Sequence, residues 1–303
     1  MHKLLTEQTM KEFNIKGTGV ALVTPFDKQS NVDFTSFGKL INHVIEGGVD
    51  YIVCLGTTSE YPTLTEKEIF AIREFIIEAV DNRVPIVLGM GGNNTRELVN
   101  HISKDDFHGI SAVLSVSPYY NKPNQKGIME HYRHVAGSCP LPMIIYNVPS
   151  RTGSNISAET IVKLAEECKN IIGVKEASGD INQCMEILRL KPKGFELLSG
   201  EDNLTLALTA CGAKGVISVT ANAFPKLMSE MVNFALKDNF RKASALNNKL
   251  LPFFNAIFEE GNPSGIKAAL EIMGITHNTV RLPLSKVSKP LYNKLQTIIN
   301  NLM

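Results

Sequence analysis

The chain has 303 residues, of which 44% are hydrophobic, and a formal net charge of +1. This length allows one large hydrophobic core and lies near the size at which single cores stop growing. The near-neutral charge gives no electrostatic argument for binding to nucleic acid or to an anionic membrane surface. No apolar run approaches the roughly 20 residues of a membrane-spanning helix. We therefore expect a globular protein with no nucleic-acid partner and no membrane partner.

The N-terminal sequence MHKLLTEQTM lacks the apolar stretch of a signal peptide, which favours a cytoplasmic location. The five cysteines are odd in number and scattered, and none belongs to a C-x-x-C pair. The seven histidines show no H-E-x-x-H motif or other ligand spacing. We expect reduced thiols and no metal site.

Short apolar runs recur along the chain, and helical patterns separate them. The first run covers 19–26 and contains Pro25 near its end. Seven more runs follow at 51–55, 85–88, 112–116, 143–146, 171–175, 195–199 and 215–219. Helices between them are predicted from N-cap residues that precede apolar residues at helical spacing, namely Asp33, Thr65, Asn94, Ser157 and Asp180.

Eight strands that alternate with helices are typical of a (β/α)8 TIM barrel, an α/β fold. An open doubly wound sheet is the alternative, but no G-x-G-x-x-G phosphate loop follows any strand. From Pro225 onward the pattern is helical only, near 227–236, 243–258, 264–272 and after Pro290. We therefore predict a catalytic barrel over residues 1–224 and a C-terminal helical appendix over residues 225–303 that serves as core cover.

The run at 171–175 ends abruptly on Lys175, and Glu176 follows it. Active sites of barrels lie at the carboxyl ends of the strands, and an amine at such a position can act as a nucleophile. The alternative is that Lys175 and Glu176 form a solvated pair at a strand end. This segment alone does not decide between the two.

Other polar or small residues follow the carboxyl ends of neighbouring strands, so they would converge on the same mouth of the barrel. These candidates are Thr57, Thr58, Tyr119, Tyr120, Tyr146, Arg151, Gly200 and the segment 218–222. They supply hydroxyl groups that can transfer protons and a guanidinium suited to a carboxylate. Paired carboxylates for glycoside chemistry, a Ser-His-Asp set and a metal cluster are missing from these positions. The combination favours Schiff-base chemistry on a keto acid.

Five motifs at these strand ends carry a resemblance to a known family. They are G-T-T-x-E at 56–60, S-P-Y-Y-N at 117–121, Y-N-V-P-S-R-T-G at 146–153, G-V-K-E-A-S-G-D at 173–180 and G-V-I-S-V-T-A-N at 215–222. In this order they resemble the dihydrodipicolinate synthase and N-acetylneuraminate lyase family of pyruvate-dependent class I aldolases. The resemblance covers the whole barrel. It implies a lyase of lysine and diaminopimelate biosynthesis that condenses pyruvate with L-aspartate 4-semialdehyde to 4-hydroxy-tetrahydrodipicolinate.

The resemblance also implies catalytic roles. Lys175 would form an imine with pyruvate, and Tyr146 would donate and accept protons during imine formation and enamine attack. Thr57 would link Tyr146 to Tyr120, which would reach in from the neighbouring subunit of a dimer. The assembly implied is a homotetramer, a dimer of dimers.

Substrate-binding roles are implied in the same way. Thr58 and the main chain at Ile217 would hold the pyruvate carboxylate, and Gly200 would leave room for bound substrate. Arg151 would bind the carboxylate of aspartate semialdehyde with its planar guanidinium. No metal or organic cofactor would be needed beyond the covalent pyruvate imine on Lys175.

The chain departs from the family at Ser59, which stands where the family's Gly-Thr-Thr-Gly-Glu has its second glycine. A serine can form that turn if its φ is negative or if strain is tolerated. Two other functions remain open: a sister aldolase that acts on a sugar acid, such as a neuraminate lyase, and a non-catalytic relative. The Ser-Arg-Thr context of Arg151 and the Tyr119-Tyr120 pair weigh against the first. The presence of Lys175 and Tyr146 weighs against the second.

Overall fold

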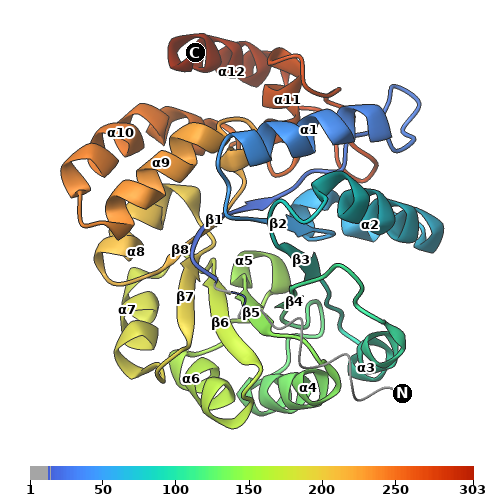
Figure 1. The fold of residues 1–303 in the computed structure, drawn as a ribbon, viewed down its shortest axis with the longest axis vertical. Helices are drawn as coiled ribbons and strands as arrows, with labels where there is room; N and C mark the ends of the chain where they lie inside the picture. Colours follow the sequence, from blue (N-terminus) through green and yellow to red (C-terminus); the bar gives the residue numbers. More distant parts are fainter. Residues whose placement is uncertain (1–12, 14) are drawn as a thin grey trace.

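The computed structural model describes residue 13 and residues 15–303. Eight parallel strands form a closed barrel in sequence order, with β1 paired to β8, and a ring of helices surrounds it (Figure 1). The strands are β1 Gly17–Ala21, β2 Tyr51–Cys54, β3 Ile86–Gly89, β4 Ala112–Val116, β5 Met143–Asn147, β6 Ile171–Glu176, β7 Glu196–Ser199 and β8 Gly215–Ser218. The predicted (β/α)8 barrel is confirmed.

The helices that follow the strands form the outer layer of the barrel. They are α1 Phe34–Glu46, α2 Glu66–Val80, α3 Thr95–Lys104, α4 Gln125–Ser138, α6 Ala158–Glu167, α7 Ile181–Leu190 and α8 Thr205–Ala210. The short helix α5 Pro149–Thr152 lies instead at the mouth of the barrel (Figure 1). One apolar cluster lies between these helices and the strands, and a second, smaller cluster fills the barrel interior. The strands are therefore buried on both faces, as parallel strands usually are.

The predicted N-cap residues are confirmed. The side chain of each accepts a hydrogen bond from the backbone N–H three residues further on, at Asp33, Thr65, Asn94, Ser157 and Asp180. The first N–H groups of a helix have no partner inside the helix, so such a cap determines where the helix begins. The five loops before these helices therefore each end at a defined residue.

The predicted first strand, 19–26, was wrong at both ends, because β1 covers Gly17–Ala21. The N–H of Val23 donates to Oδ1 of Asn222 at 3.1 Å instead of to a neighbouring strand. Pro25 has no N–H to donate. Phe26 pairs with Val32 in an isolated antiparallel bridge, so the chain turns away from the barrel after Ala21.

The C-terminal region contains α9 Pro225–Leu236, α10 Phe240–Ala256, α11 Ser264–Ile272 and α12 Lys289–Leu302. Helix α9 packs against β1, β8 and α1, in the position of a barrel helix. Helix α10 packs on α9, and α12 packs on α10 and α11, on one side of the barrel (Figure 1). The division of the chain into a barrel and an appendix remains a prediction, and these contacts show that the two parts share a core.

A buried lysine joins α11 to the loops after β1 and β2. Lys267 is fully buried, and its Nζ donates to Oε1 of Glu60 and, at 2.9 Å, to the carbonyl oxygen of Thr279. The same Nζ lies 4.1 Å from the centroid of the Phe26 ring. Burial lowers the pKa of Lys267 to about 8, and the Glu60 carboxylate opposes this effect. The lysine therefore holds three separate segments together.

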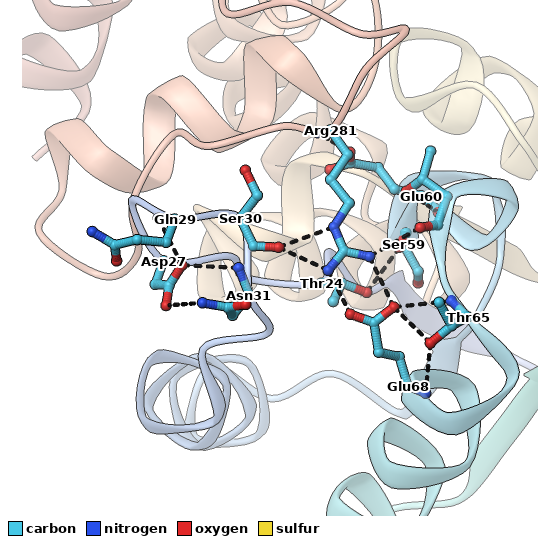
Figure 2. Close-up of polar contacts among 11 residues, drawn as sticks. Thr24, Asp27, Gln29, Ser30, Asn31, Ser59, Glu60, Thr65, Glu68 and Arg281 are labelled. Carbon is cyan, nitrogen blue, oxygen red and sulfur yellow. Dashed lines mark hydrogen bonds and ion pairs between the residues drawn. The ribbon is translucent and has the colours of Figure 1, made fainter.

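Arg281 connects the same loops from a second direction (Figure 2). Its backbone N–H donates to Oε2 of Glu60 at 2.9 Å. Its guanidinium donates to the carbonyl oxygens of Ser30 and Thr63 and to both carboxylate oxygens of Glu68. This hydrogen bonding from Arg281 is the main reason why the pKa of Glu68 falls to about 2.

The Glu68 carboxylate should contribute to stability in a pH-dependent way. Its pKa is about 2 in the folded chain and 4.5 as a model value, so its contribution is fully present above 4.5 and is lost as the pH falls towards 2. We expect Glu68→Gln to lower the free energy of unfolding by about 1–2 kcal/mol near neutral pH. Urea unfolding at a series of pH values should show this difference shrinking below about pH 4.5.

The matched control is the Glu186–Arg189 pair, which is a surface pair within one helix. Glu186→Gln should leave the free energy of unfolding unchanged within the error of the measurement, because water and salt screen an exposed pair. An equally small effect for Glu68→Gln, or one that does not change with pH, would contradict the structural role of this carboxylate.

Candidate active site

Lys175 and Tyr146 lie next to each other on adjacent strands. The register of β5 and β6 pairs Tyr146 with Lys175, and Nζ of the lysine lies 4.4 Å from the centroid of the tyrosine ring. The side chains are buried, with Lys175 6% exposed and Tyr146 8% exposed. Glu176 is 1% exposed, so the alternative of a solvated Lys175–Glu176 pair is wrong.

Glu176 anchors the end of β6 on the opposite side of the strand. Its carboxylate accepts hydrogen bonds from Nδ2 of Asn147 at 2.9 and 3.0 Å, from the N–H of Ser178 at 2.8 Å and from Nε2 of Gln183 at 3.0 Å. Burial raises the pKa of Glu176, and these hydrogen bonds oppose the increase. A strand end that is fixed in this way also fixes the backbone from which Lys175 extends.

A cavity of about 340 Å³ opens at the carboxyl ends of the strands. Four of the candidates predicted at the strand ends line it, namely Thr57, Tyr119, Tyr146 and Arg151. Lys175 is not among the lining residues and lies next to the cavity through its contact with Tyr146. The C-terminal region also lines the cavity, through Asn262 and other residues.

The loop after β2 places both threonines in a short 3-10 turn, Thr57–Ser59. Ser59 is buried, its Oγ donates to the carbonyl oxygen of Leu22 at 2.7 Å, and its own carbonyl oxygen accepts from Thr24 at 2.8 Å. The left-handed backbone positions of this loop fall on either side of Ser59, at Leu55 with φ 55° and at Glu60 with φ 57°. Serine therefore fits the position without a positive φ and gains a buried hydrogen bond.

The remaining predicted residues are divided between the barrel and its surface. Ile217 lies on β8, is 1% exposed and belongs to the interior cluster. Tyr120 is 88% exposed, has φ 73° and does not line the cavity, whereas its neighbour Tyr119 does. The chain by itself therefore brings Lys175 and Tyr146 together but leaves Tyr120 outside the site.

The model of the dihydrodipicolinate synthetase family matches residues 14–302. The chain belongs to this family. It is 46% identical to the 4-hydroxy-tetrahydrodipicolinate synthase of Parabacteroides distasonis over 97% of this chain and 99% of that protein. It is 48% identical to the synthase of the same name from Flavobacterium psychrophilum over 94% of this chain and 98% of that protein.

Solved structures of dihydrodipicolinate synthases share the fold of this family member. The chloride-inhibited dihydrodipicolinate synthase of Acinetobacter baumannii, solved in complex with pyruvate, is 39% identical with a TM-score of 0.92. The match covers 95% of this chain and 99% of that one. The dihydrodipicolinate synthase of Aquifex aeolicus is 40% identical with a TM-score of 0.90. This match covers 94% of this chain and 97% of that one.

Two residues of this dihydrodipicolinate synthetase family member were missed as site residues in the sequence. Glu201 directly follows Gly200. Burial and the nearby Asp202 raise the pKa of its carboxyl group, whereas the charges of Lys175 and Arg151 oppose the increase. The sequence signal that could have identified Glu201 is its position, as an acidic residue, just after the end of a strand. Asn262 was missed because no strand precedes it.

Among residue 13 and residues 15–303, no helix is both long and apolar enough to cross a membrane. Within the same residues, no group of three His, Cys, Asp or Glu side chains is arranged to hold a metal ion.

Gly200 brings β7 close to the end of β6. Its N–H donates to the carbonyl oxygen of Glu176 at 2.7 Å. A Cβ at this position would lie 2.4 Å from Cβ of Ala177 and 2.9 Å from the carbonyl oxygen of Glu176. The glycine therefore makes room for the neighbouring strand, and its role beside the substrate remains a prediction.

We expect Gly200→Ala to push β7 away from the backbone next to Lys175. The variant should lower the free energy of unfolding by about 1–3 kcal/mol, because neither Cβ of Ala177 nor the carbonyl oxygen of Glu176 belongs to a flexible side chain that could move away. Chemical denaturation measures this loss. The control is Gly137→Ala in α4, where a Cβ meets nothing within 4 Å, and this variant should be neutral or slightly stabilised. Equal stability of the two variants would rule out the close approach.

Proposed function

We propose that the chain condenses pyruvate with L-aspartate 4-semialdehyde to give 4-hydroxy-tetrahydrodipicolinate, with Lys175 as the Schiff-base residue. The observation that supports this most strongly is the buried Lys175 amine 4.4 Å from the Tyr146 ring centroid at the carboxyl end of the barrel. Membership of the family and near full-length relatives named as 4-hydroxy-tetrahydrodipicolinate synthases support the same reaction.

The covalent part of the proposed mechanism uses the Lys175 amine. The amine adds to the keto carbon of pyruvate, and loss of water leaves a protonated imine. This imine acts as an electron sink, so the pyruvate methyl group loses a proton and an enamine forms. The enamine carbon then attacks the aldehyde carbon of the second substrate, which restores the imine on Lys175. The amino group of the second substrate adds to this imine carbon and displaces the lysine amine, so the ring closes and Lys175 is released. Tyr146 lines the cavity beside the lysine and would transfer the protons that these steps release and require.

The two substrates carry carboxylates, and separate groups would bind them. Thr58 and the main chain at Ile217 would hold the pyruvate carboxylate. Arg151 lines the cavity and would bind the carboxylate of aspartate semialdehyde through its planar guanidinium. The imine itself activates pyruvate, so the proposed chemistry needs no further cofactor. A cytoplasmic location fits a biosynthetic enzyme of this kind.

The alternative of a sister aldolase acting on a sugar acid is not favoured. The relatives named as synthases are 44–48% identical to this chain and match over most of its length, which favours the dipicolinate reaction.

Borohydride trapping tests the proposed covalent intermediate. Reduction in the presence of pyruvate should fix pyruvate on the peptide that contains Lys175 and raise its mass. Lys175→Ala should not be labelled, and Lys175→Arg should not be labelled either, because a guanidinium stays protonated. Labelling of another lysine would overturn the assignment. Product formation with aspartate semialdehyde, compared with a sugar aldehyde, then separates the two candidate reactions.

The proposed assembly is a homotetramer built from dimers in which Tyr120 enters the partner's site. The exposure of Tyr120 outside the cavity of its own chain supports this arrangement. Lys175→Ala and Tyr120→Phe subunits should each be nearly inactive alone. After subunit exchange they should recover part of the wild-type activity, because a mixed dimer has one site with both wild-type residues. Verified exchange without recovery would show that Tyr120 acts within its own chain or not at all.

A further inference from the structure

Asn262, in the loop between α10 and α11, touches both proposed carboxylate-binding residues. The residue is 7% exposed. Its Nδ2 donates to Oγ1 of Thr58 at 3.0 Å. Its backbone carbonyl oxygen accepts a hydrogen bond from Nη2 of Arg151 at 3.4 Å. A residue far along the chain from the strand ends therefore contacts two groups of the site through two different atoms.

The contact with Thr58 determines where the threonine hydroxyl directs its hydrogen. A hydroxyl has one hydrogen to donate and two lone pairs that accept. When the asparagine N–H group occupies one lone pair, the hydroxyl hydrogen remains free to donate to another acceptor. A pyruvate carboxylate is such an acceptor, and a hydrogen bond to a charged group is stronger than one between neutral groups.

A second contact keeps the asparagine loop and the threonine turn together. Five residues after Asn262, the fully buried Lys267 donates to Glu60, which directly follows the turn Thr57–Ser59. Both contacts run between the same two segments, so neither segment can shift alone. The loop is therefore a fixed support for the turn.

We propose that Asn262 is a positioning residue, which acts through the Thr58 hydroxyl to set the affinity for pyruvate. This inference rests on the proposed function, because it assumes that Thr58 meets the pyruvate carboxylate. It assigns part of the substrate site to the C-terminal region. The contact with Arg151 uses the backbone of Asn262, so side-chain substitution separates the two contacts.

The main test compares Asn262→Ala with Asn247→Ala. Asn247 lies in α10, and its side-chain oxygen, like that of Asn262, is buried with no hydrogen-bond partner among the described residues. Asn262→Ala should raise the pyruvate concentration for half-maximal borohydride trapping about tenfold, the effect of one lost charge-assisted hydrogen bond. The KM for aspartate semialdehyde should stay within about twofold. Asn247→Ala should change neither quantity.

A double-mutant cycle with Thr58→Val shows whether the asparagine acts through the hydroxyl. In the Thr58→Val background, Asn262→Ala should have no further effect on pyruvate trapping, because the group that it positions is absent. Additive effects would overturn the proposal. An equal rise in both substrate constants, or a loss of thermal stability without a change in pyruvate affinity, would also overturn it and indicate a purely structural role.

Asn262→Asp is a second variant of nearly the same volume, for the case in which the alanine variant does not fold. Its carboxylate accepts where the amide donates, so the Thr58 hydroxyl turns towards it, and pyruvate affinity should again fall about tenfold. Unchanged pyruvate affinity in Asn262→Asp would overturn the role of Asn262 but would leave the proposed function intact. Failure of the wild-type protein to trap pyruvate on Lys175 would overturn the proposed function, and this inference with it.

Discussion

Closure of the barrel is the constraint on which the rest of this structure depends. Because β1 pairs with β8, each of the eight barrel strands has a neighbour on both sides, and all eight carboxyl ends face one rim. The register of β5 and β6 then places Tyr146 opposite Lys175. Side chains alternate between the two faces of a strand, so a slip of one residue in β6 would turn Lys175 outward and bring Glu176 into the barrel. The hydrogen bonds that hold Glu176 outside therefore help to keep the lysine inside.

The buried pair of Lys267 and Glu60 gives the C-terminal region a role beyond covering the core. Two charges are removed from water there, and removing one partner of such a pair typically costs about 3–5 kcal/mol, because the other charge is left without compensation. Each member of the pair has a further hydrogen-bond partner. The lysine also donates to the carbonyl oxygen of Thr279, and the carboxylate also accepts from the backbone N–H of Arg281. The geometry of the threonine turn thus depends on residues more than 200 positions later in the chain.

The sequence predicted most of the fold because its signals are local. Apolar runs of strand length and N-cap residues such as Thr65 with Glu68 lie within a few residues of the elements that they define. The end of β1 was predicted incorrectly, because the partner that draws Val23 away from the ladder is Asn222, 199 residues away. Lys175 and Tyr146 could be predicted as site residues because both lie at strand ends of the barrel. Asn262 could not, because its importance comes only from a contact with Thr58 across 204 residues.

The proposed site therefore contains two kinds of groups, which differ in how they are held. Hydrogen bonds within the chain fix Thr58 and the end of β6 next to Lys175 before any substrate arrives, so these groups need no rearrangement during the reaction. The Tyr120 side chain, by contrast, is 88% exposed in the single chain. In the proposed mechanism, the carboxylate-binding groups belong to a single folded chain, whereas the complete proton relay requires a second one. Substrate binding and catalytic turnover would then depend differently on assembly, because only turnover uses a group that the partner must hold in place.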